Sequence, residues 1–343
     1  MLDRRRFIRT SAALTLLAPS LRLVHAATPK DARFVMVILR GGLDGLAAVA
    51  PWGEPRYSQL RGELALGSPG NSDGALKLDG LFGLHPALEN MHALFQAGEL
   101  NVVHATATPY RERSHFDGQK VLEAGLVSPS TTAGGWLNRA LSAIAENDAP
   151  RDGIALAANV PLALRGPYQV SSWSPSRLPD TDEDTLQRIL SVYQASDAML
   201  AERLEDALNA QALAGTSANA DRMGGGRGGQ ALGPLTSAAA RFLREPDGPR
   251  IAVIEANGWD THANQGAANG GLAFRLRALD QGLKSLKDEL GSTWDSTTVM
   301  IVTEFGRTVA VNGTRGTDHG TASCAFVAGG AINGGRVITD WPG

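Results

Sequence analysis

The segment that decides the fold is residues 296–320, "STTVMIVTEFGRTVAVNGTRGTDHG". Its first part, residues 296–303, is an apolar, β-branched run, which predicts a buried strand. The strand ends in an acid, Glu304, and continues into a glycine-rich loop that carries the adjacent pair Asp318 and His319. A loop that only connects two elements does not need two metal-capable side chains in a row. The segment therefore predicts a central, parallel strand whose carboxyl end opens into a functional site, with the loop folding back to return the pair to that site.

Strand and helix patterns alternate along the rest of the chain. Short apolar runs predict further strands at residues 33–39, 100–105, 153–158, 250–256 and 324–330. Helical spacing predicts helices at residues 85–98, from 114 onward, and at 135–146, 182–215 and 271–290. This alternation is typical of βαβ units, so the predicted fold class is α/β, with a mostly parallel central sheet and helices on both faces. Residues 160–232 carry mainly helical patterns and predict a helical insertion or cap.

The first 26 residues have the pattern of a signal peptide. A basic segment, "DRRRFIRT", precedes a short apolar run and the small-residue site before "HAAT". The pair Arg4 and Arg5, followed by Phe7, matches the twin-arginine pattern, with an ordinary Sec signal as the alternative. The apolar run is too short to span a membrane. We therefore expect a domain at 27–343 without a transmembrane segment. It would be exported by the twin-arginine translocase and be periplasmic or secreted.

Charge and cysteine content narrow the classes of function. The chain has 32 basic and 35 acidic residues. Residues 1–26 hold five Arg and one Asp, so the rest of the chain has 27 basic and 34 acidic residues and a net charge of −7. An acidic protein is a poor partner for a phosphate backbone, which argues against nucleic acid. Cys324 is the only cysteine, so no intrachain disulfide can form. Stability must therefore come from the apolar core.

Polar side chains follow four of the predicted strands. In an open parallel sheet the ligand site lies at the carboxyl ends of the strands, so these side chains are candidate site residues. In chain order they are Arg40, Asp44, Ser114, His115, Asp260, His262, Glu304, Asp318 and His319. Aspartate and histidine bind Zn²⁺ and similar divalent ions, and a two-metal centre needs about six such ligands. We expect Asp44, Asp260, His262, Asp318 and His319 to converge, with polar atoms within about 6 Å of a common centre.

Each candidate also has a purely structural interpretation. Asp44 fits a turn, and Asp318 fits an Asx-turn. Ser114 fits a helix N-cap, since with Asp117 it forms a capping-box pattern. Asp260 and His262 fit a helix cap and a surface imidazole. The joint placement after successive strands, rather than any one residue, favours a site.

Several longer motifs resemble one protein family. They are "ILRGGLDGL", "FGLHPAL", "RSHFDGQKVLE", "GGWLNRAL", "GWDTHANQ", "EFGRTVAVNG", "GTDHG" and "GGRVITDWPG". In this combination, over nearly the whole sequence, the chain resembles the DUF1501 family of twin-arginine-exported bacterial proteins. That family is similar in turn to the alkaline phosphatase superfamily, which includes phosphatases, sulfatases and cofactor-independent phosphoglycerate mutases.

The superfamily resemblance implies roles for the candidate residues. Asp44 corresponds to the acid after the first strand and Ser114 to the nucleophile. Asp260 with His262 would supply one metal, and Asp318 with His319 the other; Glu304 lies at the strand end, where that acid usually stands. The spacing departs from the pattern, because only one residue separates Asp260 from His262. A last histidine is expected downstream, so either the chain is a fragment or that ligand is absent.

Two classes of function remain open, and the sequence leaves undecided whether the protein is an enzyme. The first is an exported metal-dependent hydrolase of a phosphoric or sulfuric ester, carried by a small molecule or a polymer. A divalent Zn, Mn, Mg or Ca ion would activate Ser114 or a water, and His115 would assist catalysis or add a ligand. Arg113, beside the presumed nucleophile, and the more distant Arg40 and Arg307 are candidates to hold substrate oxygens. The second is a non-catalytic exported binding or accessory protein that keeps the fold.

The export signal can be tested directly. Changing Arg4→Lys and Arg5→Lys together should leave uncleaved precursor in the cytoplasm, because the translocase reads the arginine pair. Cell fractionation with immunoblotting measures the outcome. Normal processing of the double variant would overturn the twin-arginine assignment.

Overall fold

The computed structural model describes residues 31–130, 134–144, 152–175, 182–214 and 232–343. The predicted signal peptide lies outside these ranges. The chain divides into Met1–Ala32 and Arg33–Gly343, and all elements described here belong to the second unit. Within the described ranges, none of the helices has the length and apolar character needed to cross a membrane.

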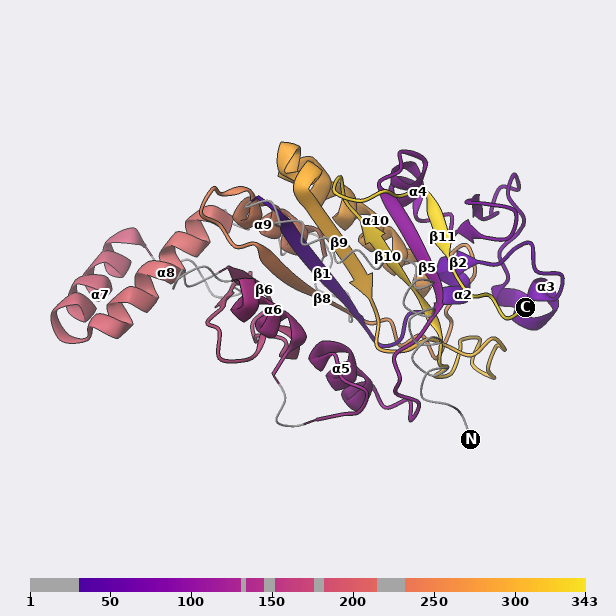
Figure 1. The fold of residues 1–343 in the computed structure, drawn as a ribbon, viewed down its shortest axis with the longest axis horizontal. Coiled ribbons are helices and arrows are strands. Elements are labelled where there is room, and N and C mark those ends of the chain that lie inside the picture. The colour runs from indigo at the N-terminus through magenta and orange to yellow at the C-terminus, as the bar shows by residue number, and fades with distance from the viewer. Residues whose placement is uncertain (1–30, 131–133, 145–151, 176–181, 215–231) are drawn as a thin grey trace, which may run out of the picture. The chain divides into compact units, whose positions relative to one another are not determined.

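An eight-stranded sheet forms the centre of the unit (Figure 1). Its order is β11 (Arg336–Ile338), β5 (Leu100–Thr106), β10 (Ser323–Ala328), β9 (Thr297–Val302), β1 (Arg33–Arg40), β8 (Ile251–Asn257), β6 (Gly153–Leu156) and β7 (Ser171–Ser172). Five of the neighbouring pairs are parallel, which confirms the predicted mostly parallel sheet. Strand β10 is antiparallel to both neighbours. The segment between β9 and β10 contains no helix to carry the chain back across the sheet, so β10 returns from the carboxyl edge.

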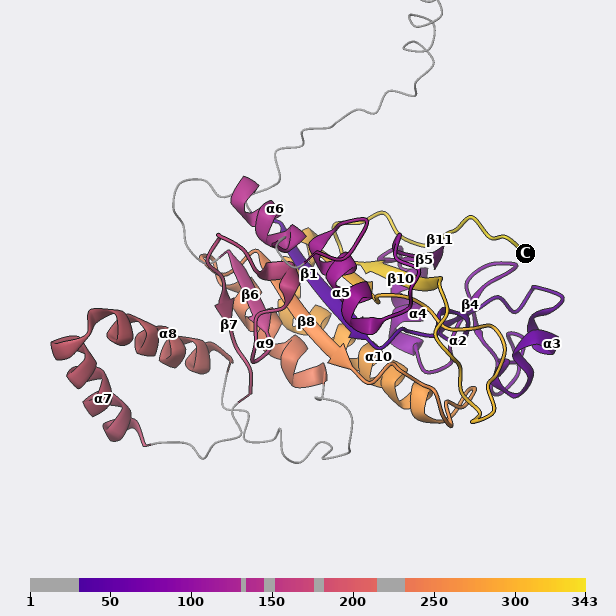
Figure 2. The same ribbon diagram turned by 90° about the horizontal axis from the view of Figure 1, so that it is seen from below.

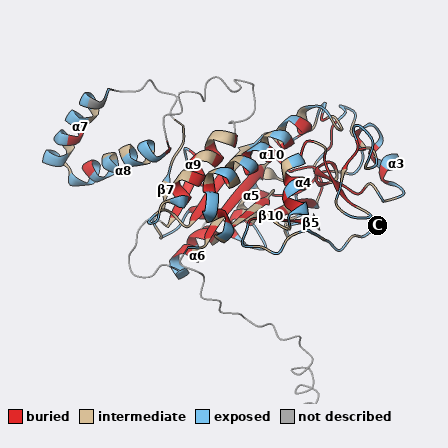
Figure 3. Cartoon of the chain, turned by 90° about the horizontal axis from the view of Figure 1, so that it is seen from above, coloured by how far each residue is buried: buried red, intermediate tan, exposed pale blue. Residues whose placement is uncertain are grey.

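Alternate side chains of β1 face two different helical layers. Val35, Val37 and Leu39 pack in the core with α4 (Glu89–Gln96), α9 (Leu232–Arg244) and α10 (Gly271–Leu290). Met36 and Ile38 pack with α6 (Trp136–Ile144) and the 3₁₀ turn η2 (Leu162–Leu164). Helix α5 (His115–Ala124) lies with α6 on this second face (Figure 2). The strand period of two thus buries both sheet faces, which appear in red between the layers in Figure 3.

The helix predicted at 182–215 is two helices, α7 (Glu183–Ser196) and α8 (Ala198–Ala214). The break falls at Asp197, whose backbone is extended and whose carboxylate accepts hydrogen bonds from the amides of Met199 and Leu200. Aspartate favours such a cap over a helix interior, which explains the interruption. Residues 160–232, predicted to be mainly helical, also contain η2 and β7. Residues 176–181 and 215–231 lie outside the described ranges.

Several short elements escape the sequence patterns. They are α2 (Gly45–Ala48), α3 (Tyr57–Arg61), the turns η1 (Gly62–Leu64) and η3 (Gly291–Ser296), and a small sheet ordered β2 (Val49–Ala50), β4 (Gly83–Leu84), β3 (Leu76–Lys77). Helix α9 was also not predicted. Two-residue strands are too short for any alternation to show, so tertiary contacts decide them.

The core makes a chemical prediction about Cys324. Its side chain is buried in β10, and burial raises the pKa of the thiol because the thiolate is poorly solvated there. The native protein should therefore not react with an aromatic disulfide reagent at pH 8, whereas the protein in guanidinium chloride should react completely. Absorbance of the released thiolate measures the reaction. Rapid stoichiometric labelling of the native protein would contradict the burial of β10.

Candidate metal centre

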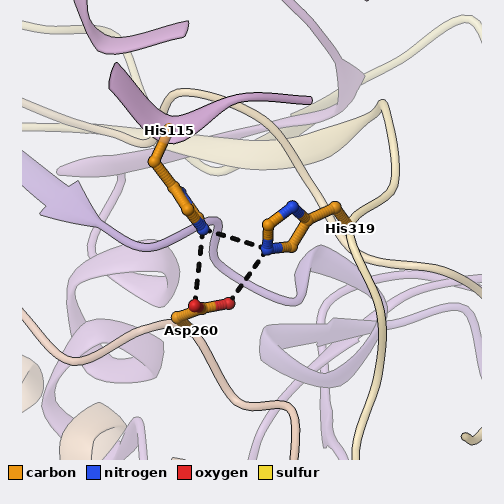
Figure 4. Close-up of side chains that lie close together, drawn as sticks. All are labelled: His115, Asp260 and His319. Atoms are coloured by element: carbon orange, nitrogen blue, oxygen red, sulfur yellow. Dashed lines mark hydrogen bonds and ion pairs between the residues drawn. The ribbon is translucent and has the colours of Figure 1, made fainter. Parts of the chain in front are cut away.

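Four side chains from three loops meet at the carboxyl edge of the sheet. His115 begins α5, Asp260 and His262 follow β8, and His319 lies between β9 and β10. His319 Nε2 is 3.0 Å from Nε2 of His115, 3.0 Å from Nε2 of His262 and 3.2 Å from Oδ1 of Asp260. His115 Nε2 is 3.4 Å from Asp260 Oδ2, and His262 Nε2 is 2.9 Å from Asp260 Oδ1. We call these four residues the His/Asp cluster; three of them are drawn in Figure 4.

The second ring nitrogen of each histidine has its own acceptor. His115 Nδ1 lies 2.8 Å from Glu304 Oε1, and His262 Nδ1 lies 3.3 Å from Asp318 Oδ1. His319 Nδ1 lies 3.0 Å from the carbonyl oxygen of Arg113. Because these acceptors can only receive a hydrogen bond, the neutral form of each imidazole carries its proton on Nδ1. All three Nε2 lone pairs then point into the cluster.

Lone pairs that face one another at 3.0 Å repel unless a positive charge lies between them. Histidine ligands of metals commonly donate the other ring N–H to a carboxylate or a backbone carbonyl, as all three do here. Ligands about 2.0–2.1 Å from a tetrahedral Zn²⁺ lie about 3.3 Å apart, close to the 2.9–3.4 Å found in the cluster. The residues therefore fit a divalent metal ion held by His115, Asp260 and His319, whose ligand atoms all lie within 4.8 Å of one another. His262 adjoins this set through its contacts with Asp260 and His319.

Arg307 orients the carboxylate of the cluster. Its Nη1 donates to Asp260 Oδ1 at 2.7 Å, and its Nε donates to Thr317 Oγ1 at 3.3 Å. Partial burial alone would raise the pKa of Asp260, but Arg307 and the nearby histidines lower it below its ordinary value. The guanidinium, predicted to bind substrate, is thus engaged with a cluster acid; its buried Nη2 has no hydrogen-bond partner among the described residues.

Glu304 and Asp318 lie behind histidines rather than in the cluster. Glu304 Oε1 accepts hydrogen bonds from His115, from Gln119 Nε2 at 3.0 Å and from the Gly41 amide at 2.9 Å. Burial alone would raise the pKa of Glu304, but these hydrogen bonds lower it. Asp318 Oδ1 accepts from Asn312 Nδ2 at 3.0 Å as well as from His262, and the pKa of Asp318 is lowered, mainly by Asn312. Both acids were predicted as ligands, and the structure instead makes them partners of ligands.

Asp44 does not join the cluster, contrary to the predicted convergence. Its Oδ1 caps α2 by accepting from the amides of Leu46 and Ala47, and its Oδ2 accepts from Arg61 Nη2 at 2.6 Å and Gln265 Nε2 at 2.7 Å. Among the other predicted ligands, Asp260, His262 and His319 meet in one cluster, which both imidazoles share. The expectation of two separate metal pairs is therefore not met in the described residues.

The predicted substrate-binding and nucleophilic residues differ in what they contact. Arg40 is paired with Glu255 and with Glu123 at 2.9 Å, so its guanidinium is already occupied by two acids. Ser114 is the N-cap residue of α5, but its hydroxyl makes no capping hydrogen bond, so the capping-box prediction is wrong. Arg113 is exposed and has a left-handed backbone, with φ 58°, which places its carbonyl oxygen on His319.

Sequence patterns missed the residues that support the cluster. They are Arg61, Gln119, Gln265, Asn312 and Thr317. Asn312 lies in an Asn-Gly turn pair, which signals a bend but no ligand partner. No spacing relates the other four to the strand ends, because their contacts span long sequence separations.

Fold and site together define an α/β protein with a candidate metal centre at the carboxyl edge of a mostly parallel sheet. Residues 96–343 match the family model described as "Protein of unknown function (DUF1501)". The chain belongs to this family. No protein among those with curated functions has a significant sequence match to it.

Three solved structures illustrate the structural similarity. The C-terminal periplasmic domain of EcEptC from Escherichia coli, in complex with Zn, has a TM-score of 0.44 at 9% identity, over 86% of this chain and 72% of that one. An alkaline phosphatase superfamily protein from Vibrio parahaemolyticus has a TM-score of 0.40 at 10% identity, over 90% of this chain and 62% of that one. A mutant TAB5 alkaline phosphatase with Mg bound has a TM-score of 0.40 at 11% identity, over 89% of this chain and 94% of that one. Similarity of this degree carries no argument about activity, which must rest on the site.

The placement of Glu304 behind His115 predicts the effect of a substitution. Glu304→Gln should weaken metal affinity by about tenfold to a hundredfold, because a hydrogen-bond partner that orients a ligand is lost while the four cluster groups remain. Competition with a chromogenic chelator measures the dissociation constant. Asp288→Asn, on the exposed face of α10, is the matched control and should bind metal normally. Unchanged affinity in Glu304→Gln would contradict this role.

Proposed function

We propose that the protein is an exported metal-dependent hydrolase that acts on a phosphoric or related ester. The observation that carries the proposal is the convergence of His115 Nε2, His319 Nε2 and the Asp260 carboxylate at 3.0–3.4 Å, with His262 in contact with the last two. Among Zn, Mn, Mg and Ca, imidazole nitrogen donors favour Zn²⁺, because Mg²⁺ and Ca²⁺ prefer oxygen ligands. The predicted twin-arginine signal supports export to the periplasm or beyond.

One side of the His/Asp cluster is open to solvent. The side chains of Asp260 and His262 are 41% and 43% exposed, whereas His115 and His319 are 24% and 26% exposed. Catalytic metal sites keep a position for water or substrate, while structural sites are closed by protein ligands. The exposure of Asp260 and His262 therefore favours a reactive centre over a purely structural one.

The neighbouring residues have distinct parts in this proposal. A bound metal ion would act as a Lewis acid on the ester and would lower the pKa of a hydroxyl group or water. Ser114, directly before His115 and free of capping, offers a hydroxyl nucleophile; a water is the alternative. Arg113 extends into solvent beside it and can hold anionic ester oxygens through its guanidinium. Arg307 keeps Asp260 ionised and oriented.

A second candidate function is a metal-binding accessory protein without catalysis. It is favoured by the engagement of Arg40 and Arg307 with protein carboxylates, which leaves Arg113 as the predicted substrate arginine that is open to solvent. Both candidates require the metal, so metal binding tests what they share. Ester hydrolysis by the metal-loaded protein separates them.

His319→Ala provides the test of the shared centre. Wild-type protein should melt at a higher temperature when Zn²⁺ or Mn²⁺ is added, since a ligand at a hundred times its dissociation constant stabilises by about 2.7 kcal/mol. The variant should gain much less, because His319 contacts every other member of the cluster. His92→Ala, a histidine on α4 outside the cluster, is the control and should respond like wild type. Equal metal-induced shifts in all three proteins would contradict the centre.

The same proteins test the reaction. Metal-loaded wild type should release p-nitrophenol from its phosphate, sulfate or phosphonate esters, and His319→Ala should not. Metal binding without turnover of any of these esters would favour the accessory role.

A further inference from the structure

The carboxylate of Asp44 is fully buried and already has four donors. The amides of Leu46 and Ala47 donate to Oδ1 at 3.1 and 3.2 Å. Arg61 and Gln265 donate to Oδ2 at 2.6 and 2.7 Å. A carboxylate oxygen offers about two lone-pair positions, so both oxygens are saturated. No lone pair remains for a metal ion unless one of these donors leaves.

Arg61 supplies the positive charge that the buried acid needs. Its side chain is 0% exposed, and its Nη1 also donates to the carbonyl oxygens of Thr308 at 3.2 Å and Val309 at 3.1 Å. The Asp44–Arg61 pair is neutral, and a buried pair of this kind is stable only while both charges are present. A divalent ion at Asp44 would add two positive charges beside a guanidinium that cannot lose its proton.

We infer that Arg61 stands where a second metal ion would otherwise neutralise Asp44, so that the protein holds one metal ion, in the His/Asp cluster. This inference rests on the proposed metal-dependent function and specifies the composition of its centre. It also assigns Asp44 and Arg61 to positioning the centre rather than to ligation or catalysis.

Hydrogen bonds connect this pair to the cluster. Gln265, which donates to Asp44, accepts through Oε1 from Thr261 Oγ1 at 2.7 Å and from Thr317 Oγ1 at 2.9 Å. Thr261 lies between Asp260 and His262, and Thr317 accepts from Arg307. Thr308 and Val309, held by Arg61, directly follow Arg307. The buried pair therefore holds two of the three loops that carry the cluster, the loop after β8 and the loop between β9 and β10.

Metal stoichiometry tests the inference. Wild type and Asp44→Asn, each dialysed against excess Zn²⁺ and then against metal-free buffer and analysed by mass spectrometry of the metal, should both hold about one equivalent. Two equivalents in wild type, falling to one in Asp44→Asn, would overturn the inference and leave the proposed function intact. No metal in folded wild type would instead overturn the proposed function. Asp280→Asn is the matched control: Asp280 is a buried acid that accepts from the start of α4, and its loss should change stability without changing the metal count.

Arg61→Lys tests the positioning role and does not depend on Asp44→Asn folding. Lysine keeps the charge, but one ammonium group cannot reproduce the fork that reaches both Asp44 and the two carbonyls. We expect one equivalent of Zn²⁺ bound about tenfold more weakly than in wild type, the lower end of the loss seen when support for a ligand is removed. Circular dichroism confirms folding, and the exposed pair residue Arg188, changed to Lys, is the control. Wild-type affinity in Arg61→Lys would contradict the positioning role.

Discussion

The parallel pairing of β1 with β8 and β9 is the constraint on which the site depends. It places the carboxyl ends of three strands side by side, so residues more than two hundred positions apart in the chain become neighbours. The loops can then touch, because glycine occupies the closest approaches: a side chain on Gly41 would lie 2.5 Å from the Asp260 amide, and one on Gly316 would lie 2.3 Å from the His262 backbone. Backbone contacts between loops, such as Thr317 N to Thr261 O at 3.1 Å, fix the ligand positions.

The cluster differs from the charged groups around it, because those groups are paired with opposite charges or hydrogen-bond donors. The two buried arginines near the edge each hold one acid, Arg61 on Asp44 and Arg307 on Asp260, while Arg40 is shared by two glutamates. Glu304 is satisfied by donors from two different segments, helix α5 and the turn at Gly41. The imidazoles of the cluster are different, since their protonated nitrogens are satisfied and their lone pairs face one another. The cluster therefore holds lone pairs without donors, whereas the polar groups around it are paired. This difference is what favours a bound metal ion at the cluster.

Local patterns predicted the regular elements well and the short ones poorly. Helix α10 was predicted at its observed bounds, and β1, β5, β8, β9 and β10 within one or two residues, because long periodic runs determine their own conformation. The direction of β10 was not predictable, since it depends on where the β9–β10 loop goes. That loop does fold back as expected: Arg307 and His319 form an antiparallel bridge, which returns His319 to the edge of the sheet.

The sequence by itself determined the fold class and the chemical nature of the site. Strand periodicity and the acids and histidines after successive strands are local properties, and they led to Asp260, His262 and His319. Tertiary structure alone decided which metal-capable side chain faces the centre. Asp44 and Glu304 have the same carboxyl chemistry as Asp260, but Arg61, 17 residues from Asp44, and His115, 189 residues from Glu304, occupy their oxygens. A ligand is defined by the direction and freedom of its lone pairs, and those depend on partners that no sequence spacing records.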